Sequence, residues 1–171
     1  MLRIDAALTR LLSPAKVNPV AVRSAGLILY RGTGRNLELL LVHPGGPFWQ
    51  KRDEGAWSIP KGEIEANEDG LEAARREFRE ELGVAAPDGE CVDLGAVRQA
   101  GGKTVHAWAL AGDLDVARLM SNTFPLEWPP RSGQIQQFPE VDRAAWLDTD
   151  SARRKLVEAQ RLFVDRLEEL L

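Results

Sequence analysis

The segment that decides the fold is Gly62–Val84, which reads GEIEANEDGLEAARREFREELGV. Apolar residues in its second part recur at the three- and four-residue spacings of an amphipathic helix; they are Leu71, Ala74, Phe78 and Leu82. Asn67 is a suitable N-cap for a helix that starts near Glu68, and Gly83 stands where a left-handed residue often ends one. We therefore predict a loop followed by a capped helix over residues 68–82.

A cluster of carboxylates lies on another face of this helix. Residues three and four apart share a helix face, so Glu77, Glu80 and Glu81 come together, with Arg76 one turn below Glu80. Such carboxylates repel one another unless a cation lies among them, and oxygen ligands suit Mg²⁺ or Mn²⁺ better than zinc. A solvent-facing charged helix would have the same composition, so the cluster alone leaves both interpretations open.

The whole segment resembles the Nudix box, Gly-x5-Glu-x7-Arg-Glu-U-x-Glu-Glu-x-Gly-U, in which U is apolar. Every fixed position is matched, by Gly62, Glu68, Arg76, Glu77, Glu80, Glu81 and Gly83, and Phe78 and Val84 fill the two U positions. The resemblance implies a Nudix fold of the α/β (α+β) class, an α/β/α sandwich with a mixed β-sheet. It also implies a hydrolase that cleaves pyrophosphate bonds and depends on Mg²⁺, with Mn²⁺ as the alternative.

The resemblance further implies roles for the box residues. Glu80 and Glu81 would be the principal metal ligands, and Glu77 would be either a third ligand or the general base. Arg76, together with Glu68, would orient these carboxylates.

Two residues outside the fixed positions complete the implied site. The backbone carbonyl of Lys61, just before the box glycine, would join the metal shell. Some members use a glutamate from a later loop as general base, and Glu140 is the candidate here. The alternative for Glu140 is a turn residue that follows Pro139.

Residues for substrate binding follow from three local patterns. The stretch Trp57–Gly62 resembles the Pro-Lys-Gly entry of Nudix enzymes acting on dinucleoside polyphosphates or oxidised nucleotides, so Trp57 and Lys61 are expected to contact substrate. Gly101–Trp108 resembles a hairpin of related MutT-type proteins, in which Lys103 would reach a distal phosphate. His106 and Trp108 would share one face of that strand, where a place in the core is the alternative.

A third pattern lies in residues 127–133, where Trp128 could stack on a base and Arg131 could meet a phosphate. Packing of this loop on its own surface is the alternative, and the same choice holds for Phe48, Trp49 and Lys51 in the earlier loop.

The rest of the chain is predicted to form the strands and the second helical layer of the sandwich. Strands are predicted at Gly26–Tyr30, Leu37–His43, Val92–Arg98, Val105–Ala111 and Val141–Trp146, with a short extended piece at Trp57–Ile59. Residues 113–139 contain four prolines, and we expect an irregular binding loop there. A final helix is predicted over Ser151–Leu171, with its apolar side at Leu156, Phe163, Leu167 and Leu170. Residues 1–19, with helical spacing over Ile4–Leu12, would form an N-terminal arm before a Nudix domain at residues 20–171.

Composition limits the surroundings of the protein. The formal net charge of −4 argues against a general nucleic-acid binder. The longest apolar runs are about one strand long, so no membrane partner is expected. The single cysteine, Cys91, excludes an intrachain disulfide and makes a cytoplasmic setting the default. The sequence leaves open whether the protein forms a homodimer.

The expected substrate is a small nucleotide, either a nucleoside triphosphate that can be oxidised or a dinucleoside polyphosphate. The only tyrosine, Tyr30, precedes the box, whereas diadenosine-polyphosphate members often place one after it. Capped RNA, ADP-ribose and sugar nucleotides are alternative substrates, and a nucleotide-sensing module that does not cleave is the alternative function.

Overall fold

The computed structural model describes residues 23–171. The predicted N-terminal arm at residues 1–19 lies outside the described residues. Eight strands are described: β1 (Arg23–Arg31), β2 (Glu38–Pro44), β3 (Lys61–Glu63), β4 (Cys91–Arg98), β5 (Thr104–Ala111), β6 (Thr123–Glu127), β7 (Ile135–Pro139) and β8 (Val141–Asp148). The three α-helices are α1 (Gly70–Leu82), α2 (Thr149–Lys155) and α3 (Arg161–Leu170), and short 3-10 turns lie at Gly34–Asn36, Val116–Arg118 and Glu158–Gln160.

Six of the strands form one mixed sheet. Its order is β4-β5-β1-β2-β8, and β3 pairs with the first part of β1. β1 and β5 run parallel, whereas the other pairs are antiparallel. The mixed sheet predicted from the sequence is confirmed.

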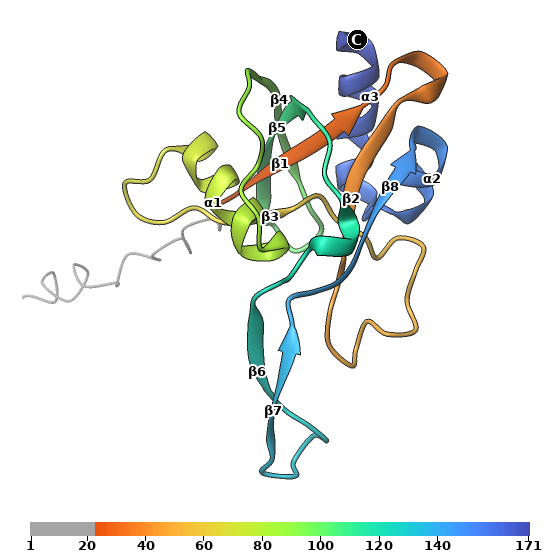
Figure 1. Cartoon of the computed structure of the whole chain (residues 1–171). Coiled ribbons are helices and arrows are strands. Elements are labelled where there is room, and N and C mark those ends of the chain that lie inside the picture. The colour runs from red at the N-terminus through yellow and green to blue at the C-terminus, as the bar shows by residue number, and fades with distance from the viewer. Residues whose placement is uncertain (1–22) are drawn as a thin grey trace, which may run out of the picture.

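Helices cover both faces of this sheet (Figure 1). Successive side chains of a strand point to opposite faces, so Leu27 and Leu29 pack toward α1 while Ile28 packs toward α3. Because both faces of β1 are buried, its centre is a continuous apolar run rather than an alternating one. This two-sided core is the α/β/α sandwich.

Helix α1 begins two residues later than the sequence predicted. Asp69, not Asn67, is its N-cap, and the Asp69 carboxylate accepts hydrogen bonds from the backbone N–H groups of Leu71 and Glu72. An N-cap needs an extended backbone, which Asp69 has, whereas Asn67 is left-handed with a φ of 63°. Gly83 ends the helix in the left-handed region, as predicted.

The predicted final helix is divided in two. The backbone N–H of Trp57 donates to the Lys155 carbonyl, and the N–H of Val157 donates to the Trp57 carbonyl, each at 2.9 Å. These bonds hold Leu156 in an extended conformation between α2 and α3. Leu170, predicted on the apolar side, is 56% exposed.

Residues 123–139 form a regular hairpin, and not the irregular loop that the prolines suggested. β6 and β7 make a separate two-stranded sheet, here called the β6–β7 arm, which projects from the sandwich (Figure 1). Each strand of a two-stranded sheet has one unpaired edge, where a proline removes no ladder hydrogen bond. This explains how Pro125 and Pro139 fit into strands.

No helix within residues 23–171 has the length and apolar character needed to cross a membrane.

Candidate active site

The carboxylates of α1 line an open pocket of about 550 Å³. Its walls come from α1, β3, the end of β2, the following loop and the root of the β6–β7 arm. The lining residues are Pro44, Gly45, Trp49, Lys61, Gly62, Glu63, Glu77, Glu80, Glu81, Phe124 and Glu140. The structure thus brings the three box glutamates together with Lys61 and with the distant Glu140.

The Arg76 guanidinium holds the carboxylates of the box in place. Its Nε and Nη2 donate to the two oxygens of Glu68 at 2.8 and 2.9 Å, and this contact lowers the pKa of Glu68 to about 2. Its Nη1 donates to Glu77 Oε1 at 2.6 Å and to Glu80 Oε2 at 3.3 Å. The planar guanidinium fixes these directions, so Arg76 is placed to orient both pocket carboxylates.

The box glycine makes room for one of these carboxylates. A Cβ on Gly62 would lie 2.0 Å from the carboxylate carbon of Glu77. Any other residue would displace the Glu77 carboxylate, so glycine at this position leaves Glu77 its place in the pocket.

Burial controls the protonation of the pocket. It raises the pKa of Glu81 to about 8, against the charge of Lys61 and the Lys61 backbone N–H, which donates to Glu81 Oε2 at 3.1 Å. It also raises the pKa of Glu77 and of Glu140, where the charges of Glu77 and Glu80 add to the shift. Burial and mutual repulsion therefore disfavour the ionised carboxylates, and a bound cation would favour them.

The donor set fits a divalent cation in kind, because carboxylate oxygens are the ligands that Mg²⁺ and Mn²⁺ prefer. Within residues 23–171, no three acidic, histidine or cysteine side chains converge closely enough to hold a metal as they stand. Arg76 holds one oxygen each of Glu77 and Glu80, and the Lys61 N–H holds one oxygen of Glu81. A cation in this pocket would therefore require side-chain rotations of these glutamates.

Glu140 is held at the pocket by backbone hydrogen bonds. The N–H of Asn122 donates to the Glu80 carbonyl at 3.1 Å, and the N–H of Glu140 donates to the Asn122 carbonyl at 2.8 Å. The Glu140 carbonyl in turn accepts from the N–H of Gly45 at 2.9 Å. These bonds connect the last turn of α1, the root of the arm and the loop after β2, and they set the place of the Glu140 side chain.

Trp57 lies in the core, contrary to the expectation that it contacts substrate. Its side chain is 4% exposed and belongs to the core cluster that includes Phe163 and Leu156, on the α3 side of the sheet. Its Nε1 donates to Asp53 Oδ1 at 2.7 Å. The α1 carboxylates lie on the other side of the sheet, so the ring packs away from them.

Lys103 lies beside the pocket and is not part of its lining. Its Nζ is 3.8 Å from Glu63 Oε1. His106 stacks on Trp108 with ring centroids 4.2 Å apart, and Trp108 packs against the core cluster on the α1 side. The two rings thus stack along β5, and His106 Nε2 pairs with Asp93 Oδ1 at 2.6 Å.

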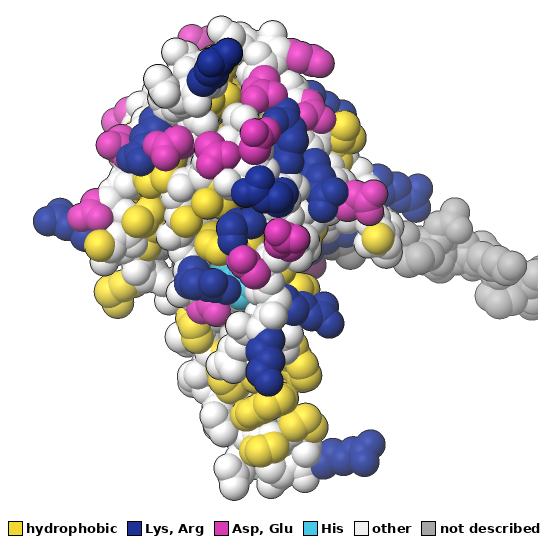
Figure 2. Space-filling view, turned by 90° about the vertical axis from the view of Figure 1, so that its right-hand side faces the viewer, with side chains coloured by type: hydrophobic (Ala, Val, Ile, Leu, Met, Phe, Trp, Pro, Cys, Tyr) yellow, Lys and Arg dark blue, Asp and Glu magenta, His cyan; other side chains and the backbone are white. Residues whose placement is uncertain are grey.

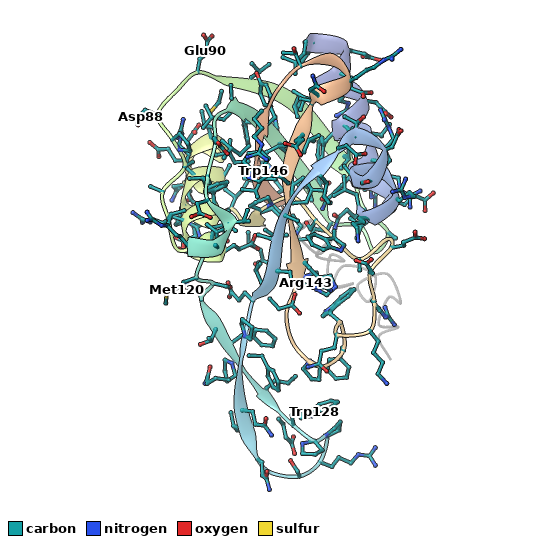
Figure 3. All side chains as sticks on the ribbon, turned by 45° about the vertical axis from the view of Figure 1, so that its right-hand side comes forward. Asp88, Glu90, Met120, Trp128, Arg143 and Trp146 are labelled. Atoms are coloured by element: carbon teal, nitrogen blue, oxygen red, sulfur yellow. The ribbon has the colours of Figure 1, made fainter. Side chains whose placement is uncertain are left out.

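Trp128 and Arg131 lie at the outer end of the β6–β7 arm, outside the pocket lining. Figure 3 shows Trp128 near the tip, far along the arm from the sandwich. Its ring meets Phe48 edge-to-face, with centroids 5.4 Å apart, and Arg131 is exposed. The structure does not bring these two residues to the carboxylates.

Two aromatic residues line the pocket instead. Trp49 comes from the loop after β2, and Phe124 comes from the first part of β6. Sequence reasoning left Trp49 undecided and missed Phe124. The alternation of Phe124, Leu126 and Trp128 is the signal for a strand with one apolar face, but the prolines of this region concealed it.

Comparison with known proteins identifies the family. The family profile described as NUDIX domain matches residues 20–167, which is most of the chain. The chain belongs to the Nudix hydrolase family. An RNA pyrophosphohydrolase of Gluconacetobacter diazotrophicus is 32% identical over 156 residues, covering 81% of this chain and 84% of that protein. An octanoyltransferase of Myxococcus xanthus is 29% identical over 140 residues, covering 81% of this chain but only 34% of that protein, so the chain spans about a third of this relative's length.

Solved structures agree on the fold. A crystal structure of a Caenorhabditis elegans Ap4A hydrolase binary complex matches with a TM-score of 0.61 and 20% sequence identity. The match covers 86% of this chain and 96% of that one. The predicted α+β Nudix fold, with a mixed sheet and helices on both sides, is confirmed.

Proposed function

We propose that this Nudix pyrophosphohydrolase cleaves a phosphoanhydride bond in a nucleoside polyphosphate, either a nucleoside triphosphate or a dinucleoside polyphosphate. The observation that carries the proposal is the pocket itself, in which Glu77, Glu80, Glu81 and Glu140 lie with Lys61. The carboxylates supply oxygen ligands, and the lysine supplies a point charge for a phosphate.

Each of these residues has a role in the proposed reaction. Glu80 and Glu81 would hold a divalent cation, which when bound neutralises phosphate charge and lowers the pKa of water. Arg76 orients Glu77 and Glu80, and Lys61 stabilises negative charge on the polyphosphate. The attacking water loses its proton to a carboxylate, and phosphate or a nucleotide leaves from the attacked phosphorus.

Glu140 is the better candidate for the general base. Arg76 occupies one oxygen of Glu77 at 2.6 Å, whereas the contacts of Arg76 within residues 23–171 do not include Glu140. The pKa of each of the two carboxylates is raised, which suits a base near neutral pH, so the contact with Arg76 is what separates them.

A phosphate-release assay tests this proposal. Normal and oxidised nucleoside triphosphates, dinucleoside polyphosphates, ADP-ribose, sugar nucleotides and cap analogues would be incubated with Mg²⁺, with Mn²⁺ or with EDTA. Metal-dependent turnover of one class that is lost in Glu80→Gln would support it. Binding without turnover across the panel would support the nucleotide-sensing alternative.

A second candidate is the triphosphorylated 5′ end of RNA, favoured by the G. diazotrophicus relative whose name is RNA pyrophosphohydrolase. Exposed cations Lys51 and Arg52 lie in the loop that also carries Trp49, where they could meet further phosphates. A short triphosphorylated oligonucleotide assayed beside the matching nucleoside triphosphate separates the two. A kcat/KM at least tenfold higher for the oligonucleotide would favour RNA.

A further inference from the structure

The β6–β7 arm presents one apolar face that the loop after β2 covers only in part. Phe124 and Leu126 of β6 share this face with Trp128, which follows the strand directly, because side chains two apart point to the same side. Phe138 of β7 lies directly opposite Phe124 in the register, and the two rings are 6.2 Å apart. Hydrophobic side chains are accordingly visible along the projecting arm (Figure 2). A two-stranded hairpin needs something to pack on, so this face requires a cover.

The loop after β2, residues 45–56, supplies only part of that cover. A Cβ on Gly46 would lie 3.1 Å from the Phe124 ring, so the loop touches the arm near its root. Farther out, Phe48 meets Trp128 edge-to-face, yet Phe48 remains 60% exposed. Loop and arm therefore stand side by side, joined at the root and again near the tip.

The loop reaches the carboxylate pocket through Trp49, and the arm reaches it through Phe124. Both line it together with Lys61 and the glutamates. The guanidinium of Arg52 lies 5.4 Å from the Trp49 ring, and this contact uses one face of the indole. A ligand whose phosphates lie at Lys61 and the glutamates would therefore have both aromatic side chains within the same pocket.

We propose that Trp49 and Phe124 form the subsite for the base of the nucleoside polyphosphate, and that the arm is the specificity element of the enzyme. This rests on the proposed function above. Aromatic side chains stack on any base, and the position of these two next to a phosphate-binding pocket selects a nucleotide base over other apolar groups. The Phe48–Trp128 contact positions the loop against the arm and so sets the width of the subsite.

The base subsite is tested by substituting its two residues and comparing a ligand that has a base with one that has none. Trp49→Ala and Phe124→Ala are expected to raise KM for the best nucleoside triphosphate about tenfold, the loss expected for one stacking contact. The Ki of inorganic tripolyphosphate, measured as a competitive inhibitor, is expected to stay within about twofold, because this ligand has no base. Trp49→Phe and Phe124→Tyr keep a ring and should restore KM to within about threefold.

Two controls separate base binding from damage to the arm. Ile135→Ala and Gln137→Ala alter exposed side chains on the face of β7 that points away from Phe124; both should leave KM unchanged. If KM for the nucleotide and Ki for tripolyphosphate rise together in Trp49→Ala and Phe124→Ala, or if neither changes, the subsite is overturned.

Failure of the proposed function gives a different result. If the wild-type protein hydrolyses no nucleoside polyphosphate, the same variants are compared by the rise in Tm that a nucleoside triphosphate produces. A rise that is present in the wild type and absent in Trp49→Ala and Phe124→Ala would support the base subsite in a binding module. An equal rise in all three would overturn it.

Discussion

Helix α1 and the β6–β7 arm reach the same pocket by different routes. α1 carries Glu77, Glu80 and Glu81 at helical spacing, and Arg76 on the same helix holds two of them. The arm contributes Phe124 and, at its junction with β8, Glu140, whose places depend on backbone bonds to α1 and to the loop after β2. The charged part of the site is therefore local in sequence, whereas the proposed base subsite is assembled by tertiary contacts.

The largest effect is expected at the carboxylates of α1. Glu80→Gln and Glu81→Gln each remove a charged oxygen ligand, and we expect kcat/KM to fall about a thousandfold, in line with several kcal/mol of charge stabilisation. Steady-state phosphate release measures it. Glu72→Gln on the exposed side of α1 is the matched control and should retain full activity. A loss of less than tenfold in both variants would remove the box from the chemistry.

The next largest effect is expected at Glu140, where a substitution tests whether the arm contributes to catalysis as well as to binding. Glu140→Gln is expected to lower kcat about a hundredfold, the range for a general base, with KM unchanged and the acidic limb of the pH–kcat profile lost. Glu77→Gln serves as the comparison. If Glu77→Gln loses the acidic limb and Glu140→Gln keeps it, the base lies on α1 and the arm only binds.

A smaller loss is expected for the residue that orients the carboxylates. Arg76→Lys keeps the charge but cannot make the paired bonds to Glu68 while also reaching Glu77. We expect kcat to fall about tenfold to a hundredfold, as for other residues that orient metal ligands, with a weaker apparent affinity for Mg²⁺ in a metal titration. Arg79→Lys, exposed on the same helix, should behave as wild type. An unchanged metal affinity in Arg76→Lys would contradict the orienting role.

The smallest effect concerns stability and the burial of Glu81. Its pKa is raised from 4.5 to about 8 in the folded protein, so between these values the folded state binds more protons than the unfolded state. The free energy of unfolding therefore falls as the pH rises through this window. In EDTA we expect the Tm of the wild type to decrease from pH 5 to pH 8 and that of Glu81→Gln to decrease less. Equal slopes in thermal melts would show that Glu81 is ionised without a cation.

Much of the fold could be predicted from local patterns. The apolar runs of β1 and β2 and the spacing of Phe78 and Leu82 on α1 reflect periodicities that any strand or helix must have to bury one side. The errors arose where long-range contacts override these patterns. The division of the last helix depends on hydrogen bonds between Trp57 and the chain around Leu156, which lie far apart in sequence.

The same distinction holds within the candidate site. The spacing of the box placed its glutamates on one helix face, and the link between Arg76 and Glu68 could be expected from the motif. The positions of the aromatic residues could not. Trp57 precedes the box by only a few residues yet packs on the other side of the sheet, while Phe124, well after the box, lines the pocket.

The family, the mixed-sheet sandwich and the charged helix face could be predicted from the sequence, because they depend on short spacings along one helix or strand. The distant residues that join that face depend on tertiary contacts. Backbone hydrogen bonds among α1, the arm and the loop after β2 bring Glu140, Trp49 and Phe124 to the carboxylates. Such bonds join N–H and C=O groups that every residue but proline carries in full, so side-chain identity reveals little of their pairing.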